Sequence, residues 1–129
     1  MKNITAFIAL LFLSSFGFAQ NGPKINILQS ENTVDYGKVY KSNDNGIRNF
    51  TFTNTGDAPL NISAIQSTAS CTILYKPTQP ILPGKSDRIE IKYNMVPGPI
   101  RKTITVETNA VNYEEGRVPL KIKGEVLTN

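Results

Sequence analysis

The chain has 129 residues with one cysteine, no histidine and no tryptophan, and its formal net charge is +4 at pH 7. A single cysteine excludes an intramolecular disulfide, and the lack of histidine excludes Ser-His-Asp and Cys-His catalytic sites and the usual zinc ligand sets. The 14 basic residues are scattered among 10 acidic ones instead of forming a stripe with aromatics, so we expect no nucleic-acid partner.

Residues 1–19 have the layout of a cleaved secretory signal peptide. An uninterrupted apolar run covers residues 6–13, and Gly17 and Ala19 place small residues three and one before a cut ahead of Gln20. The run is too short to span a bilayer comfortably, which favours cleavage over the alternative, an uncleaved membrane anchor. We therefore expect a periplasmic or secreted protein with no stable membrane span after signal cleavage.

Short β-strands follow, separated by turns rich in Gly, Pro, Asn and Asp. Period-two alternation is their main signature. In residues 88–93, for example, the isoleucines and the tyrosine face one way, and the three charged residues that alternate with them face the other. A change of apolar parity at Gly37 predicts a bulge within the second strand. The expected strands are, in chain order, Ile25–Leu28, Thr33–Tyr40, Arg48–Thr53, Leu60–Gln66, Ser70–Tyr75, Arg88–Tyr93, Thr103–Glu107 and Val118–Val126.

This spacing of half-buried strands predicts an all-β fold, a single immunoglobulin-like β-sandwich of seven to eight strands. The expected organisation is a signal peptide at 1–19, a lead-in at 20–32 with a possible first strand, and one immunoglobulin-like domain at 33–127. About 110 residues remain after signal cleavage, which is enough for one hydrophobic core without disulfide staples.

Three phrases of the sequence occur together in one known family. Residues 35–39 read DYGKV, residues 50–62 read FTFTNTGDAPLNI, and residues 81–84 read ILPG. In order and spacing they resemble the D-F-G-x-V opening, the F-x-F-x-N-x-G-x-x-P-L-x-I stretch and the I-x-P-G turn of DUF1573 domains, which are common in exported Bacteroidetes proteins. The closing strands are similar too, so the resemblance covers residues 33–126.

The DUF1573 resemblance also implies a class of function. This family resembles the immunoglobulin-like group that includes ASH domains and major sperm protein, which implies a non-enzymatic binding or scaffolding module. We therefore expect a protein partner, another envelope or periplasmic protein. The chain departs from the family at one point, because the family often has Cys-x-Cys where this sequence reads Ala69-Ser70-Cys71.

Cys71 is the candidate reactive thiol. A mixed disulfide with a partner or small thiol would make the chain a thiol-linked redox or sensing protein, which is one alternative function. The other interpretation is a small packed apolar side chain, because Cys71 shares its strand parity with Ile73 and Tyr75. No basic residue lies within four positions to lower the thiol pKa.

The last strand is the candidate interaction surface. Pro119 has no N–H to donate to a ladder, so we expect this strand at a sheet edge, at least at its start. Lys121 and Lys123 on its outer face would discourage uncontrolled edge pairing. The functional interpretation is β-augmentation by a partner strand around these three residues, and the alternative is an ordinary protected edge.

We predict no catalytic residues, no metal site and no cofactor, and hence no enzyme. Glu114 and Glu115 are adjacent carboxylates in a turn, and neighbours in an extended chain point to opposite sides. A third alternative is a carbohydrate or small-ligand module that uses loop aromatics such as Tyr40 and Tyr113, although the lack of tryptophan weakens sugar stacking.

Overall fold

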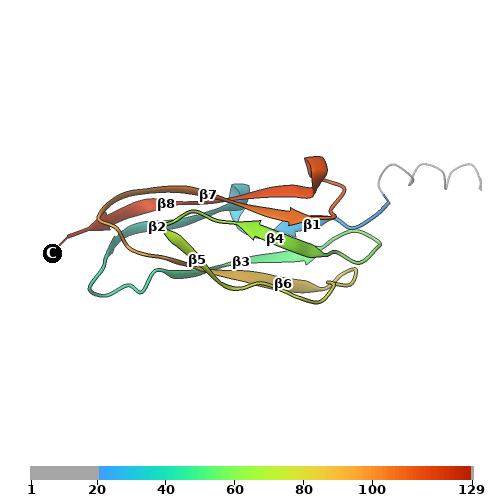
Figure 1. Ribbon diagram of the computed structural model, residues 1–129, viewed down its shortest axis with the longest axis horizontal. Coiled ribbons are helices and arrows are strands. Elements are labelled where there is room, and N and C mark those ends of the chain that lie inside the picture. The colour runs from blue at the N-terminus through green and yellow to red at the C-terminus, as the bar shows by residue number, and fades with distance from the viewer. Residues whose placement is uncertain (1–20, 129) are drawn as a thin grey trace, which may run out of the picture.

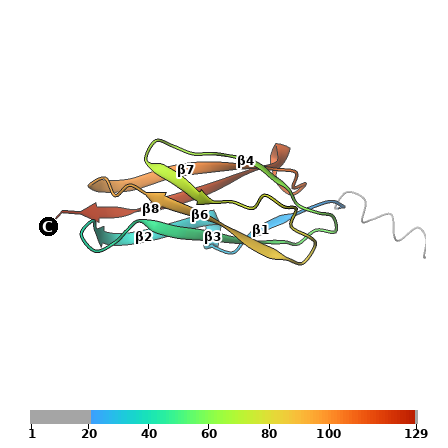
Figure 2. The ribbon, with the colours of Figure 1, turned by 60° about the horizontal axis from the view of Figure 1, so that its bottom comes forward.

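The computed structural model describes residues 21–128, so the expected signal peptide lies outside the described residues. Within this range, eight strands form two four-stranded sheets that pack face to face (Figures 1 and 2). The strands are β1 (Ile25–Ile27), β2 (Thr33–Tyr40), β3 (Ile47–Asn54), β4 (Ile62–Gln66), β5 (Cys71–Tyr75), β6 (Ser86–Tyr93), β7 (Gly98–Thr108) and β8 (Arg117–Leu127). Two short 3-10 turns, η2 (Ser30–Asn32) and η3 (Glu114–Gly116), precede β2 and β8.

The strand order is that of an immunoglobulin-like sandwich. Sheet A has the order β1-β3-β6-β5, and sheet B has the order β2-β8-β7-β4. All neighbours are antiparallel except β2 and β8, which run parallel. The predicted fold class, an all-β immunoglobulin-like sandwich of seven to eight strands, is confirmed.

The core follows from the period-two alternation of the sequence. In β8 every second residue from Val118 to Ile122 is buried, and β6 alternates in the same way. Burying one such side chain contributes about 1.5–3 kcal/mol. Side chains that meet between the sheets include Phe50, Phe52, Ile89, Ile91, Ile104, Val106, Val118, Leu120 and Ile122. No helix within residues 21–128 is long and apolar enough to cross a membrane.

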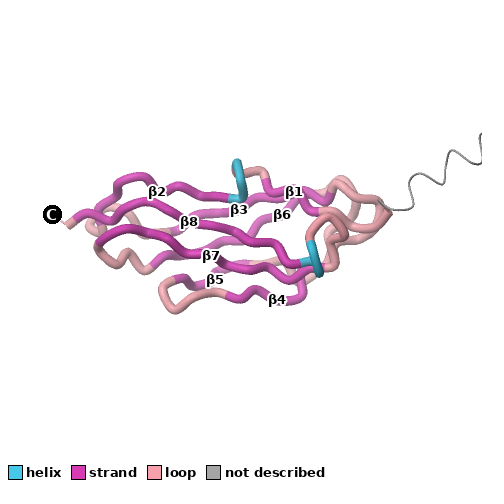
Figure 3. The backbone as a smooth tube through the Cα atoms, turned by 90° about the horizontal axis from the view of Figure 1, so that it is seen from above, coloured by secondary structure: helices cyan, strands magenta, loops and turns pink. Residues whose placement is uncertain are grey.

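β8 is an interior strand from Lys121 onward, so the prediction that it lies at a sheet edge holds only at its start, where residues 117–120 pair with β7 alone. It pairs with β7 from Arg117 to Val126 and with β2 from Lys121 onward. From Lys121 onward, β8 therefore has β2 on one side and β7 on the other (Figure 3). Pro119 lies in the part of β8 that comes before the pairing with β2 begins at Lys121. Its missing N–H therefore removes no hydrogen bond with β2.

The expected bulge at Gly37 is confirmed. The register of β2 on β8 shifts between Asp35 and Lys38, and Gly37 has a φ of +68°. The side chain of Asp35 accepts a hydrogen bond from the Gly37 N–H at 2.8 Å, which fixes the bulge. A positive φ favours glycine because other residues clash with their own backbone there.

Asn54, at the end of β3, is the one fully buried polar side chain among residues 21–128. Its Oδ1 accepts hydrogen bonds from the N–H groups of Lys24 (3.3 Å) and Gly56 (2.9 Å). Its Nδ2 donates to the carbonyls of Ala58 and Ile81, both at 2.8 Å. One amide therefore joins the lead-in, the turn after β3 and the loop before β6.

The close packing around this amide explains the Asn-x-Gly spacing. A Cβ at Gly56 would lie 2.1 Å from the Gly22 carbonyl oxygen and 2.6 Å from the Lys24 nitrogen. Only glycine lets the turn approach the lead-in closely enough for both to reach the Asn54 side chain.

We predict that Asn54→Ala lowers the free energy of unfolding by about 3–5 kcal/mol, because it removes four hydrogen bonds and leaves the Lys24 and Gly56 N–H groups and the Ala58 carbonyl without this partner. Urea denaturation measures this change. Asn43→Ala, in an exposed turn, should stay within about 0.5 kcal/mol of the parent protein. A loss below about 1 kcal/mol for Asn54→Ala would contradict the role assigned to this amide.

Candidate functional site

Cys71 begins β5 and is buried, with 6% of its surface exposed. Burial raises the pKa of its thiol, and a hydrogen bond with Thr68 and the charge of Lys102 oppose this to a smaller extent. A protonated, buried thiol is a poor nucleophile. The geometry therefore favours the packing interpretation of Cys71 over the reactive one.

A tyrosine pair lies next to Cys71. Tyr93 is directly opposite Cys71 on β6, and the ring centroids of Tyr36 and Tyr93 are 6.1 Å apart. The Tyr36 hydroxyl donates to the Gly46 carbonyl at 2.7 Å, and the Arg48 guanidinium lies 4.2 Å above the Tyr36 ring. Burial raises the pKa of Tyr36 to about 12, so this phenol stays protonated at neutral pH and serves to hold the turn before β3.

Among residues 21–128, no three His, Cys, Asp or Glu side chains lie close enough together to hold a metal ion. Glu114 and Glu115 lie in η3 and are both exposed, as expected for a turn.

We predict that Cys71 reacts with an alkylating reagent at least about 100-fold more slowly in the native protein than in urea, because reaction requires local opening. Mass spectrometry of quenched samples gives both rates. A cysteine at the next position, Thr72→Cys in a Cys71→Ala background, is exposed and should react at similar rates in both conditions. Equal native and unfolded rates for Cys71 itself would support the reactive interpretation.

The edges of sheet A are capped by side chains and a loop. Beside β1, which has three residues, Oδ1 of Asn112 accepts from the Ile25 N–H (3.1 Å) and its Nδ2 donates to the Ile25 carbonyl (3.0 Å). Beside β5, the Cys71 N–H donates to the Thr68 carbonyl, and the Cys71 carbonyl accepts from the Ser67 hydroxyl. These contacts occupy backbone groups that an added strand would need.

The edges of sheet B are irregular. β2 carries the bulge at Gly37, and the register of β4 on β7 shifts between Ile62 and Ala64. Bulges twist an edge away from a straight partner strand and leave residues unpaired. All four edge strands are thus short, bulged or capped, which disfavours β-augmentation as the mode of binding.

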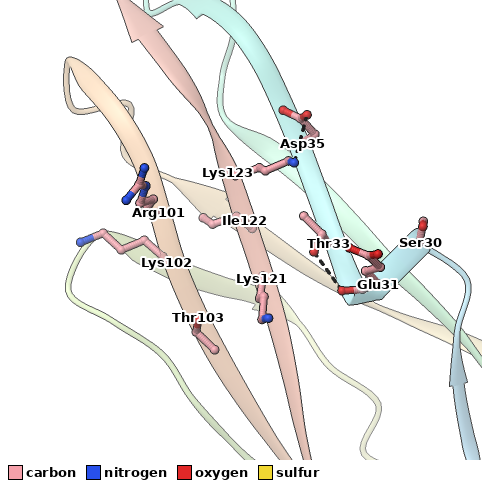
Figure 4. Close-up of a pocket in the computed structure, with 10 residues that line it drawn as sticks. All are labelled: Ser30, Glu31, Thr33, Asp35, Arg101, Lys102, Thr103, Lys121, Ile122 and Lys123. Carbon is pink, nitrogen blue, oxygen red and sulfur yellow. Dashed lines mark hydrogen bonds and ion pairs between the residues drawn. The ribbon is translucent and has the colours of Figure 1, made fainter.

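The outer face of sheet B carries a groove of about 620 Å³ that crosses β2, β8 and β7 (Figure 4). We call it the sheet B groove. Pairing brings its cations together, because Arg101 on β7 is directly opposite Lys123 on β8 and Lys121 lies two residues away. The residues that line it are Ser30, Glu31, Thr33, Asp35, Arg101, Lys102, Thr103, Lys121, Ile122 and Lys123.

The charges of the sheet B groove are only partly compensated. The Lys123 Nζ lies 4.0 Å from Oδ2 of Asp35. No carboxylate of the described residues lies within 4.0 Å of the charged groups of Arg101 or Lys121. Like charges directly opposite each other destabilise a strand pair. The centre of the groove is therefore an electropositive site that the fold maintains at a cost in stability.

Sequence reasoning had singled out Lys121 and Lys123, but for an edge that the topology does not provide. It missed Arg101, which is far from them in sequence and joins them only through the register of β7 on β8. The loop aromatics do not form a joint platform, because Tyr40 is opposite Leu127 at the end of β8 while Tyr113 lies just before the start of β8. The structure thus weakens the carbohydrate alternative.

We predict a repulsive coupling between Arg101 and Lys123 of about 0.2–1 kcal/mol in the free energy of unfolding. A double-mutant cycle with Arg101→Thr, Lys123→Thr and the double variant isolates this pair. The coupling should shrink when the salt concentration is raised, because exposed charges are screened. A favourable or salt-independent coupling would contradict the charge argument.

The family model described as "Protein of unknown function (DUF1573)" matches residues 27–126. This chain belongs to the DUF1573 family. The match extends the region that sequence phrases had indicated by including residues 27–32 of the lead-in before β2. No curated protein is significantly similar to the chain.

Solved structures share the fold of this DUF1573 domain at low identity. A protein of unknown function from Porphyromonas gingivalis W83 superposes with a TM-score of 0.66 at 18% identity, over 83% of this chain and 48% of that one. The secreted serine protease VesC from Vibrio cholerae gives 0.55 at 20% identity, over 80% and 23%. An ASH/PapD-like domain of human CEP192 gives 0.55 at 10% identity, over 82% and 87%.

The chain thus spans about half the length of the Porphyromonas protein that it matches and under a quarter of VesC. These likenesses establish an immunoglobulin-like, ASH/PapD-like sandwich. Because such folds host many functions, the function has to be argued from the surfaces of this domain.

Proposed function

We propose that this DUF1573 chain is an exported, non-enzymatic module that binds another envelope or periplasmic protein through the outer face of sheet B. The observation that carries the proposal is the contrast between this face and the edges. All four edge strands are short, bulged or capped, whereas the middle of sheet B presents an open groove with exposed cations.

The electrostatics of the groove also suit recognition. Complementary charge raises association rates and selects partners more than it adds raw affinity. A rigid sheet fixes the backbone positions of Arg101, Lys121 and Lys123, so only their side chains have to be ordered on binding. Export is supported by the signal-like layout of residues 1–19.

The test is photo-crosslinking in cells that express the full chain. A photoreactive amino acid at Thr103, in the groove, should give a discrete crosslinked protein adduct. Two exposed positions serve as controls, Asn49 on the outer face of sheet A and Thr72 on the β5 edge. Both controls should give no such adduct, and fractionation of the same cells should recover the protein with the envelope or periplasm.

The proposal fails if Thr103 gives no adduct, or if Asn49 or Thr72 gives the stronger one. A protein that stays in the cytoplasm with its N-terminus intact would contradict the export part of the proposal.

A further inference from the structure

The sheet B groove has a pattern of charge that indicates the chemistry of its partner. We infer that it binds an extended acidic segment of a protein, with carboxylates on alternate residues, laid along β8. This inference rests on the proposed function, that this face binds a protein, and adds the chemical class of the bound segment.

The spacing of Lys121 and Lys123 matches the repeat of an extended peptide. Lys121 and Lys123 are both exposed on the outer face of β8 and are separated by one buried residue, Ile122. Since a strand rises about 3.3–3.4 Å per residue, their Cα atoms lie about 7 Å apart. An extended peptide has the same repeat, so carboxylates at its positions i and i+2 match the two lysines.

Arg101 adds a second contact at one end of this pair. It is directly opposite Lys123 across the β7–β8 ladder, where facing side chains are about 4.5–5.5 Å apart at Cβ. A guanidinium can bind a carboxylate through two parallel hydrogen bonds. One carboxylate can therefore bridge Arg101 and Lys123, while the next carboxylate contacts Lys121.

Two threonines flank Lys121 on the neighbouring strands. Thr33 on β2 and Thr103 on β7 are its direct neighbours in the two ladders. Both line the groove. The Thr33 hydroxyl already donates to the Glu31 carbonyl at 2.9 Å, so it can accept from a peptide N–H, whereas Thr103 can either donate to a carboxylate or accept from an N–H. The site thus offers both charge and neutral polar contacts across three strands.

Two carboxylates at the β2 side of the groove favour a peptide partner over a partner with negative charge all along its length. Glu31 and Asp35 line the β2 side of the same groove. A nucleic-acid backbone or an anionic membrane would bring negative charge against them as well as against the cations. A segment with carboxylates only at alternate positions can place its charges over Arg101, Lys121 and Lys123 and its neutral residues elsewhere.

The inference is tested with synthetic peptides and the purified protein. The probe is a ten-residue peptide that alternates Glu and Thr, compared with a peptide of the same composition whose Glu residues form one block. Calorimetry at low salt should give a lower Kd for the alternating peptide, and its binding should weaken as salt rises.

A triple variant localises the binding. Arg101→Gln/Lys121→Gln/Lys123→Gln should raise the Kd of the alternating peptide by at least about tenfold, because three exposed ion pairs are lost. The control variant Lys41→Gln/Lys85→Gln/Lys92→Gln removes the same charge from exposed positions outside the groove and should change the Kd less than about twofold. Thermal unfolding confirms that both variants fold.

Three results would overturn the inference. These are an equal Kd for the block peptide, an equal effect of the two triple variants, and tighter binding of an oligonucleotide or of phosphatidylglycerol vesicles through the same three residues.

The failure of this inference is distinguishable from failure of the proposed function. If the Thr103 adduct persists in cells that carry the Arg101→Gln/Lys121→Gln/Lys123→Gln variant, the face binds a protein by other contacts and the acidic-segment inference is wrong. If the peptide preference holds but Thr103 gives no adduct, the groove chemistry stands and the proposed function is wrong.

Discussion

The buried amide of Asn54 is the contact on which the rest of this domain depends. It satisfies two backbone N–H groups and two carbonyls from three separate segments, and no other side chain of residues 21–128 is both polar and fully buried. Buried backbone groups need such partners, because an unsatisfied one costs about 1–3 kcal/mol. The amide thereby closes one end of the sandwich without a disulfide.

Closing that end has consequences for the surfaces. The lead-in, once tied to the turn after β3, places β1 beside β3, where Asn112 covers its outer edge. Capping removes the edges as simple templates for pairing with other chains. The outer face of sheet B stays open, and there the longest strands, β7 and β8, run side by side along the molecule (Figure 3). A partner therefore has access to a face of the sandwich more readily than to an edge.

The sequence predicted the strands well but not their neighbours. Alternation is a local signal, so all eight strands and the bulge at Gly37 were found from the sequence, and the parity of Cys71 indicated its burial. Sheet order depends on long-range packing. Pro119 indicated an edge correctly for the start of β8, which extends beyond β2, but not for Lys121 and Lys123. The opposition of Arg101 and Lys123 required the register of a ladder, which the sequence alone does not determine.

The most direct test of binding through the outer face of sheet B is an amide chemical-shift map. The labelled protein would be titrated with the alternating Glu-Thr peptide. Binding through this face predicts that shifts concentrate on the outer rows of β2, β8 and β7, around Thr33, Arg101, Thr103, Lys121 and Lys123. Shifts concentrated instead on the β4 and β5 edges, around Ile65 and Ile73, would contradict it.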